Sequence, residues 1–276
     1  MSNDRQQGLL KAINDLKTKD LSPSEIKEIL EKVAEIGDKN LSDDLIPLID
    51  KFENDKEIIF LLKETLSKLQ ITPYNLNEEG IAEEDADNVD GAIHKYELCV
   101  KLDPSYHWAW YNLGRMLDRK HLTEQAIDMY KKALEVNENY GDAWNNLGNI
   151  YSKINRFSLA REAYERSANC PAYDSKHFPY FNLGLLYDKV DDHGKAIEYY
   201  SKAIELRNDY AKAHYNIGRS YKKLGGAENI EKAKEFFSES IKLDSSLINE
   251  IRDQGVIIEE LMALEILKKL EKFEVS

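Results

Sequence analysis

The 276-residue sequence is poor in cysteine and has no long apolar run. Two cysteines are too few for the disulfide framework of a small secreted domain. No stretch approaches the roughly 18 consecutive apolar residues that a transmembrane helix needs. The first twenty residues also lack the apolar block and cleavage site of a signal peptide. These absences predict a cytoplasmic protein that does not enter a membrane.

The sequence also lacks the motifs of common enzyme classes. It has no GxxxxGK[ST] loop, no strand-borne GxGxxG, no HExxH and no CxxC. Cys99 and Cys170 are interpreted as buried, unreactive thiols. Asp191, Asp192 and His193 could form one corner of a metal site, but a solvated turn is favoured because no third ligand is near in sequence. We predict no catalytic residue, no metal and no cofactor.

Basic residues are in the minority, and the net charge is −13. Binding to nucleic acid draws on clustered lysine and arginine, so this balance argues against a nucleic-acid partner. The most acidic part of the chain is residues 78–90, with seven acidic residues and no basic one. Such a run is usually a solvated helix face or linker.

What the sequence has in abundance is self-similarity with a period close to 34 residues. Glycines recur at this spacing, at Gly114, Gly148, Gly184 and Gly218. Alanines form a parallel series, at Ala92, Ala126, Ala160, Ala196 and Ala233. Small residues at fixed positions fit two helices of a hairpin that approach closely, with large aromatic neighbours filling the remaining space.

Aligned on these anchors, four successive first helices read WYNLGRML, WNNLGNIY, YFNLGLLY and HYNIGRSY. Second helices read, for example, AIDMYKKALEVNE and AIEYYSKAIELRN. The pattern resembles the tetratricopeptide repeat family. The resemblance covers residues 107–246 well. Residues 73–106 match less well, with a second helix and Asp103-Pro104 but no Leu-Gly pair.

We therefore predict an all-α fold, an α-solenoid of tetratricopeptide-type helix hairpins. Residues 1–72 are expected to form N-terminal helical hairpins of HEAT-like type, with a capping box at Ser22 and Glu25 and helices over 43–53 and 55–70. Residues 73–246 form the repeat array of five units, the first degenerate. Residues 247–276 form a C-terminal helix that caps the last hydrophobic face.

Seven residues beyond each repeated glycine, the sequence predicts a turn. Asn155, Asp191 and Gly225 occupy this position in three repeats, and these residue types tolerate the left-handed backbone that ends a helix. His121 occupies it in a fourth.

Each first helix has positions that do not serve the hairpin seam, and the resemblance implies that they form the concave, ligand-facing surface. We call this set the first-helix stripe. It consists of Trp108, Tyr111, Asn112, Arg115 and Arg119; Asp142, Asn145, Asn146, Asn149 and Lys153; Phe178, Phe181, Asn182, Leu185 and Lys189; and Lys212, Tyr215, Asn216, Arg219 and Lys223.

Asparagine recurs at one position of this stripe, at Asn112, Asn146, Asn182 and Asn216. A carboxamide can pair with both the N–H and the C=O of an extended peptide. The alternative is that these asparagines belong to the repeat itself and bond between adjacent units.

The stripe carries seven bases and one acid. This excess favours an acidic segment or a free C-terminal carboxylate as ligand, although lysines that only cover the surface are an equally open interpretation. In part the stripe resembles the dicarboxylate clamp by which some family members hold the C-terminus of heat-shock chaperones. Asn149, Asn182 and Lys212 match three of the five clamp positions. Asn145 and Asn216 stand where the family has a lysine and an arginine or lysine.

Residues 78–90 have two open interpretations. They form either the solvent-facing first helix of the degenerate repeat or a segment that shields the basic groove until a partner displaces it.

The sequence thus predicts a non-catalytic adaptor or scaffold that binds another protein or peptide in the groove of a repeat solenoid. Backbone pairing by the asparagines, aromatic packing by Trp108, Tyr111, Phe181 and Tyr215, and steering by the bases would supply the affinity. One alternative is a regulatory or sensor module with separate partners for residues 1–72 and for the repeats. Another is a structural protein that assembles through its ends, and the sequence leaves the oligomeric state open.

Overall fold

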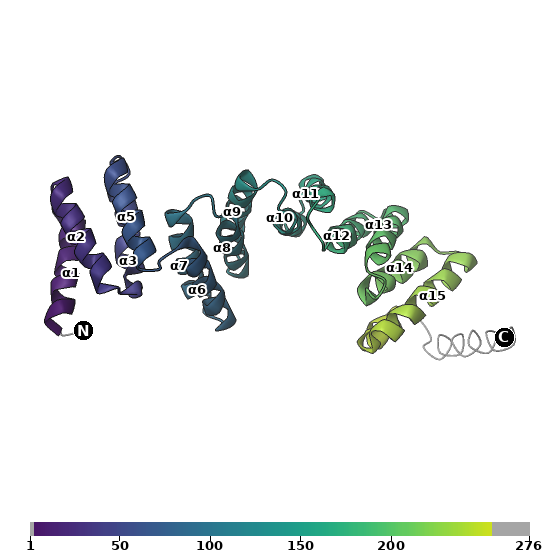
Figure 1. The fold of residues 1–276 in the computed structure, drawn as a ribbon. Coiled ribbons are helices and arrows are strands. Elements are labelled where there is room, and N and C mark those ends of the chain that lie inside the picture. Colours follow the sequence, from purple (N-terminus) through teal and green to yellow (C-terminus); the bar gives the residue numbers. More distant parts are fainter. Residues whose placement is uncertain (1–2, 256–276) are drawn as a thin grey trace. The chain divides into compact units, whose positions relative to one another are not determined.

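A computed structural model describes residues 3–255 (Figure 1). Over this range the chain is helical and contains no strand, so the all-α prediction is confirmed. The chain divides into two compact units, Met1–Glu138 and Asn139–Ser276. Each unit is a series of helices, and in both units the two helices of every repeat hairpin pack against each other.

Unit 1 begins with α1 (Asn3–Thr18) and α2 (Pro23–Ile36). The capping box is present, because the Ser22 hydroxyl accepts from the Glu25 N–H and the Glu25 carboxylate accepts from the Ser22 N–H at 2.8 Å. Helix α2 ends at Gly37, whose φ of 72° lies in the left-handed region.

The helix predicted over residues 43–53 is wrong in detail. The segment forms η1 (Lys39–Leu41) and two short helices, α3 (Ser42–Leu45) and α4 (Leu48–Lys51). Pro47 lies between them and has no N–H to donate, so a continuous helix is interrupted there. The helix predicted over 55–70 is present as α5 (Lys56–Lys68), and it packs on α2. The HEAT-like subtype of this region stays a prediction.

The repeat hairpins of unit 1 are α6 (Pro73–Asp85) with α7 (Val89–Leu102), and α8 (His107–Arg119) with α9 (Thr123–Val136). One apolar core runs from the N-terminal helices into these repeats. It includes Leu16 and Val33 as well as Leu76, Leu98 and Ala109. Residues 1–72 therefore share their core with the first repeat.

Unit 2 holds three hairpins that pack in sequence. They are α10 (Gly141–Lys153) with α11 (Phe157–Asn169), α12 (His177–Lys189) with α13 (His193–Leu206), and α14 (Ala211–Leu224) with α15 (Ala227–Leu243). Then follow η2 (Ser245–Leu247) and α16 (Ile248–Asp253). Leu247 and Ile251 are buried against Tyr215 and Phe237. The predicted cap over residues 247–276 stays a prediction, because residues 256–276 lie outside the described residues.

A glycine on the first helix faces an aromatic ring on the second in every hairpin from α6 to α15. A Cβ at Gly184 would lie 2.5 Å from ring carbons of Tyr200, and a Cβ at Gly80 would lie 2.5 Å from Tyr96 Cε1. Only glycine permits this approach. Gly80 was missed in the sequence, although it lies 34 residues before Gly114. The degenerate unit thus keeps the packing of the other repeats.

The turns also follow the predicted pattern. His121, Asn155 and Asp191 have φ values of 60°, 58° and 57°, and Gly225 has 69°. Asp87, seven residues after Gly80, has a φ of 59°. The left-handed turn therefore ends the first helix of all five hairpins.

Candidate protein-binding surface

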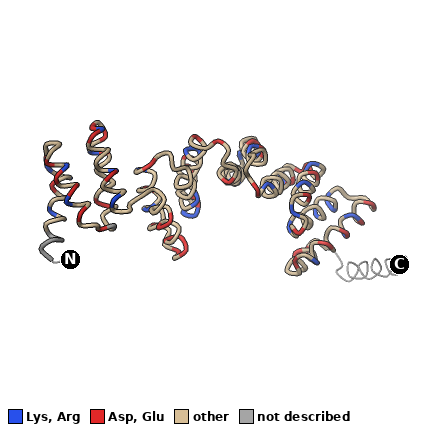
Figure 2. The backbone as a smooth tube through the Cα atoms, viewed as in Figure 1, with Lys and Arg blue, Asp and Glu red and all other residues tan. Residues whose placement is uncertain are grey.

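In unit 1, the bases of the first-helix stripe are paired with acids of the first repeat. Arg115 donates to Glu84 at 2.5 Å, and Arg119 donates to Asp87 at 2.6 Å. Beside them, Lys120 Nζ lies 2.6 Å from an Asp90 oxygen. Figure 2 shows the acidic positions in red along α6. Residues 78–90 therefore form the C-terminal part of α6, a turn and the start of α7. Glu84, Asp87 and Asp90 of this run neutralise neighbouring bases.

A cavity of 170 Å³ with a different charge arrangement lies between α12 and α14 of unit 2. Asp188, Asp191, His193, Arg219, Ser220 and Lys223 line it. The Asp188 carboxylate accepts hydrogen bonds from His193 Nδ1 at 2.9 Å, Ser220 Oγ at 2.8 Å and Tyr200 Oη at 3.0 Å. Burial and the Asp188 charge raise the pKa of Tyr200 above its ordinary value, so its phenol stays protonated as a donor.

Four bases of the unit 2 stripe make no ion pair. Within residues 3–255, no carboxylate oxygen lies within 4.0 Å of Lys189, Lys212, Arg219 or Lys223. Lys189 instead donates to Ser152 Oγ at 3.0 Å, and Arg219 donates to Asn216 Oδ1 at 2.9 Å. Lys212 and Lys223 are exposed. Acidic side chains thus neutralise the stripe bases of unit 1, Arg115 and Arg119. Within the described range they do not neutralise these four bases of unit 2.

Aromatic side chains gather at the N-terminal end of α12, the helix that ends at Lys189. Phe178 is 39% exposed. Its ring centroid lies 6.3 Å from that of Tyr210 in an edge-on arrangement, and the Phe181 centroid lies 4.8 Å from Tyr210. Phe181 and Leu185 are half-buried against Tyr200. An apolar patch is therefore open to solvent at the N-terminal end of α12, and Lys212 lies in the first turn of the next first helix, α14.

The stripe asparagines bond largely within the chain. Asn112 is buried and donates to Asn77 Oδ1 of α6 at 3.0 Å. Asn182 donates to Asn145 Oδ1 at 2.9 Å and to Asn149 Oδ1 at 3.1 Å, which joins α12 to α10. These contacts support the alternative that the asparagines link adjacent repeats.

The remaining asparagines show the same tendency. Asn216 is buried and donates to the Lys212 carbonyl at 2.7 Å. Asn146 Oδ1 accepts from Asn149 Nδ2 at 3.5 Å, and Tyr164 donates to Asn149 at 2.9 Å. Pairing of these carboxamides with a peptide backbone stays a prediction, and their internal bonds give it no support.

The other predicted positions differ in their accessibility. Trp108 is 50% exposed, and its ring lies tilted beside that of His107, with a centroid distance of 4.1 Å. Tyr111 is half-buried, 5.8 Å from Tyr130, and Tyr215 is buried, 5.9 Å from Phe237. Lys153 is exposed on α10. Trp108 and Phe178 are thus the large aromatic side chains of the stripe that solvent reaches best.

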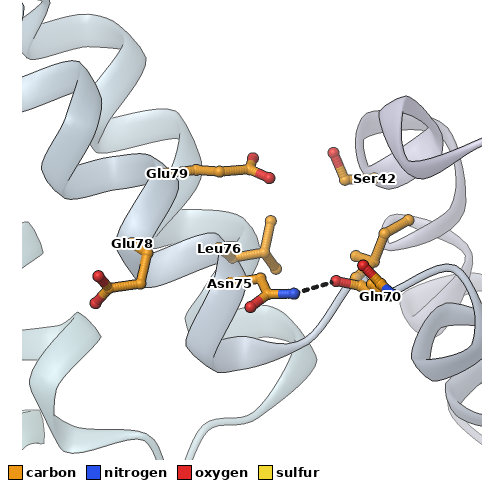
Figure 3. Close-up of a pocket in the computed structure, with 7 residues that line it drawn as sticks. Ser42, Gln70, Asn75, Leu76, Glu78 and Glu79 are labelled. Atoms are coloured by element: carbon orange, nitrogen blue, oxygen red, sulfur yellow. Dashed lines mark hydrogen bonds between the residues drawn. The ribbon is translucent and has the colours of Figure 1, made fainter.

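A second cavity, of 210 Å³, lies in unit 1 where the N-terminal helices meet α6 (Figure 3). Ser42 and Gln70 line one side, and Leu76, Glu78 and Glu79 line the other. Asn75 bridges the two sides by donating to the Gln70 carbonyl at 2.7 Å. Glu79 pairs with Lys95 at 3.0 Å. The Asn75 hydrogen bond crosses this junction, whereas the ion pair joins α6 to α7 within the first repeat hairpin.

The described residues offer no arrangement typical of catalysis. Cys99 is buried and donates to the Pro73 carbonyl, and burial followed by the nearby Asp103 charge raises the pKa of its thiol to about 12. Asp192 accepts from the Lys195 N–H and caps α13. Within residues 3–255 no three His, Cys, Asp or Glu side chains are grouped as metal ligands. Nor does any helix in that range have the length and apolarity to cross a membrane.

Comparison with known families decides the nature of these hairpins. Tetratricopeptide repeat profiles match residues 105–170 and 211–247, and a TPR repeat profile matches residues 192–225. The chain contains tetratricopeptide repeats. The matches cover α8 to α11 and α13 to η2, so they include the stripe residues of α8, α10 and α14 but not those of α12.

Several solved tetratricopeptide repeat structures are similar to this chain. MamA is 26% identical over 60% of this chain and 95% of its own, with a TM-score of 0.53. PilF of Pseudomonas aeruginosa is 17% identical over 74% and 96% of the two chains, with a TM-score of 0.56. YrrB, described as a TPR protein with an unusual peptide-binding site, is 21% identical over 77% and 98%, with a TM-score of 0.52. No curated protein matches the sequence.

Sequence reasoning missed three residues that shape the tetratricopeptide stripe. Asp188, Ser220 and Tyr210 bind or pack beside stripe residues but were assigned no role. The 34-residue register would have shown that Asp188 stands four residues after a repeat glycine, as Glu84 does. It does not show which donor each carboxylate meets, because that depends on side chains from other helices.

Proposed function

We propose that this chain is a non-catalytic scaffold that binds a partner protein through the first-helix stripe of unit 2. The partner contributes an extended segment that lies across α12 and α14. The observation that carries the proposal is the exposed Phe178 of α12 together with four bases of α12 and α14 that have no carboxylate oxygen within 4.0 Å among residues 3–255.

Apolar contact and charge have separate roles in this proposal. Burying the exposed part of Phe178 and the rim of Phe181 contributes affinity in proportion to the apolar area removed from water. The unpaired bases attract an acidic segment and fix its position, which affects the association rate and specificity more than the affinity. The asparagines hold the repeats in place, so they position the surface without touching the partner.

The rigidity of the surface supports this use. First helices α10, α12 and α14 carry the stripe, and their second helices hold them through the glycine–aromatic seam. A surface fixed before binding loses less conformational entropy when the partner docks. A cytoplasmic location belongs to the same proposal, since Cys99 and Cys170 are both buried free thiols.

The test uses the full chain and a matched pair of double variants. Phe178→Glu with Lys212→Glu changes the stripe, and Leu206→Glu with Lys202→Glu makes the same changes on α13, where Leu206 is 55% exposed. Partners captured by the natural chain are identified, purified and measured by calorimetry. We expect the stripe variant to bind about ten-fold or more weakly and the α13 variant to bind normally. Equal binding by both variants would place the partner elsewhere.

A further inference from the structure

Two pairs of first helices, with the turns that follow α6 and α12, carry charges of the same sign in the same register. Glu84 of α6 and Asp87 of the turn after it pair with Arg115 and Arg119 of α8. Adding 104 to each number gives Asp188, Asp191, Arg219 and Lys223, which belong to α12, the turn after it and α14. Both sets therefore hold two acids and two bases at equivalent positions of their repeats.

The α6–α8 set is closed. Arg115 lies 2.5 Å from Glu84, and Arg119 lies 2.6 Å from Asp87. The Glu84 carboxylate has one other near neighbour, the Tyr96 hydroxyl at 3.5 Å. Both bases thus have a carboxylate of the chain itself as partner.

The α12–α14 set is open. Asp188 bonds to Ser220 and His193 as well as to Tyr200, the counterpart of Tyr96. Ser220 and His193 stand where unit 1 has Met116 and Val89, which cannot donate to a carboxylate. These two donors hold Asp188 away from Arg219.

The second pair is open as well. Asp191 points into water with its side chain 94% exposed, and it makes no ion pair with Lys223. The 170 Å³ cavity lies among these groups.

We propose that the α12–α14 cavity binds an aspartate or glutamate side chain of the partner segment, held between Arg219 and Lys223. This rests on the proposed function and names the chemistry that the stripe recognises. In unit 1, the chain's own acids neutralise Arg115 and Arg119. Arg219 and Lys223, at the equivalent positions of unit 2, have no such partner in the described part of the chain and can pair with a carboxylate of another chain. Solvent screens Asp191, and three hydrogen bonds hold Asp188, so neither carboxylate blocks the approach.

A side chain fits better than a chain terminus. Holding a terminal carboxylate with its backbone requires free carboxamides nearby, as the family's clamp has. Here Asn216 bonds to Lys212 and Arg219, and Asn182 bonds to Asn145 and Asn149. Leu185 of α12 occupies the same repeat position as Arg219 of α14. Phe178 lies seven residues before Leu185, and seven residues of α-helix rise by about 10 Å. We therefore expect an acidic residue about three positions from an aromatic or aliphatic one in an extended segment.

The experiment selects random ten-residue peptides displayed on phage against the full chain and sequences the retained pool. Individual peptides are then synthesised with amidated C-termini and measured by fluorescence polarisation. We expect acidic residues to be enriched near an apolar residue, and Arg219→Gln with Lys223→Gln to weaken binding about ten-fold. Lys202→Gln with Lys232→Gln on α13 and α15 removes the same charge elsewhere and should leave binding unchanged.

The outcomes separate the two proposals. One contrary result is that the retained peptides need Phe178 for binding but contain no acidic residue, and another is that they bind equally well after the Arg219 and Lys223 substitutions. Either result would overturn the carboxylate site and leave the proposed function standing. Loss of binding on amidation would show a terminal carboxylate and also overturn the site as stated. If no peptide is retained, both proposals fail.

A second variant tests why Asp188 does not pair with Arg219. His193→Val with Ser220→Ala removes the two donors that hold Asp188 while both bases stay in place. We expect Asp188 to pair with Arg219 and peptide binding to weaken about five-fold. Full binding by this variant would contradict the role assigned to His193 and Ser220.

Discussion

At the scale of single residues, chemistry at a repeat position depends on which neighbours the position meets. Cys99 occupies a place that holds Ala133 and Ala203 in later repeats. All three are fully buried. A thiol fits the space of a small residue, but unlike a methyl group it can ionise. Its burial therefore makes stability depend on pH.

Replacing Cys99 by alanine tests this dependence. An unfolded thiol ionises near pH 8.5, whereas the folded pKa is about 12. The folded state is thus favoured below pH 8.5, and this advantage is lost as pH rises toward 12, by up to about 1.4 kcal/mol per pH unit. Urea unfolding between pH 7 and 10 should show a steeper fall for the natural chain than for Cys99→Ala. Parallel curves would mean that the thiol ionises freely in the fold.

At the scale of helices, the hairpin seam was predictable because it repeats. The glycine and alanine series fixed the pairing of α8 with α9 through α14 with α15, and the left-handed turns followed from it. The α3–α4 break was not foreseen, since a single Pro47 acts outside the repeat register. The internal bonds of Asn112 and Asn182 could be proposed but not chosen from the sequence, because a carboxamide suits a peptide and a neighbouring repeat equally well.

Gly80→Ala tests whether the degenerate unit packs as a full repeat. A Cβ at this position would lie 2.5 Å from a ring carbon of the fully buried Tyr96. Accommodating it should lower the free energy of unfolding by about 1–3 kcal/mol. Gly8→Ala is the control, since a Cβ there has nothing within 4 Å in helix α1 and should stabilise by up to about 1 kcal/mol. Urea denaturation measures both, and equal effects would refute the seam at Gly80.

At the scale of the whole molecule, stability in an array of hairpins comes mainly from contacts between neighbours. In unit 2, α11 packs on α12 and α13 packs on α14, while one apolar core serves α1 to α8 in unit 1. A defect in one hairpin should then spread to adjoining hairpins and fade beyond them. The asparagine bonds between α10 and α12 offer a place to introduce such a defect.

Asn182→Ala removes the donor to both Asn145 and Asn149. Leaving the buried Asn145 side-chain carbonyl without this donor, while Asn149 keeps the Tyr164 hydroxyl, should cost about 1–3 kcal/mol. Hydrogen exchange followed by mass spectrometry should show faster exchange in α10 to α13 and unchanged exchange in α1 to α5. Asn169→Ala, at the exposed end of α11, is the control and should change neither region. Equally faster exchange along the described chain would instead show that both units unfold as one cooperative body, because only global opening exposes amides far from the lost bond.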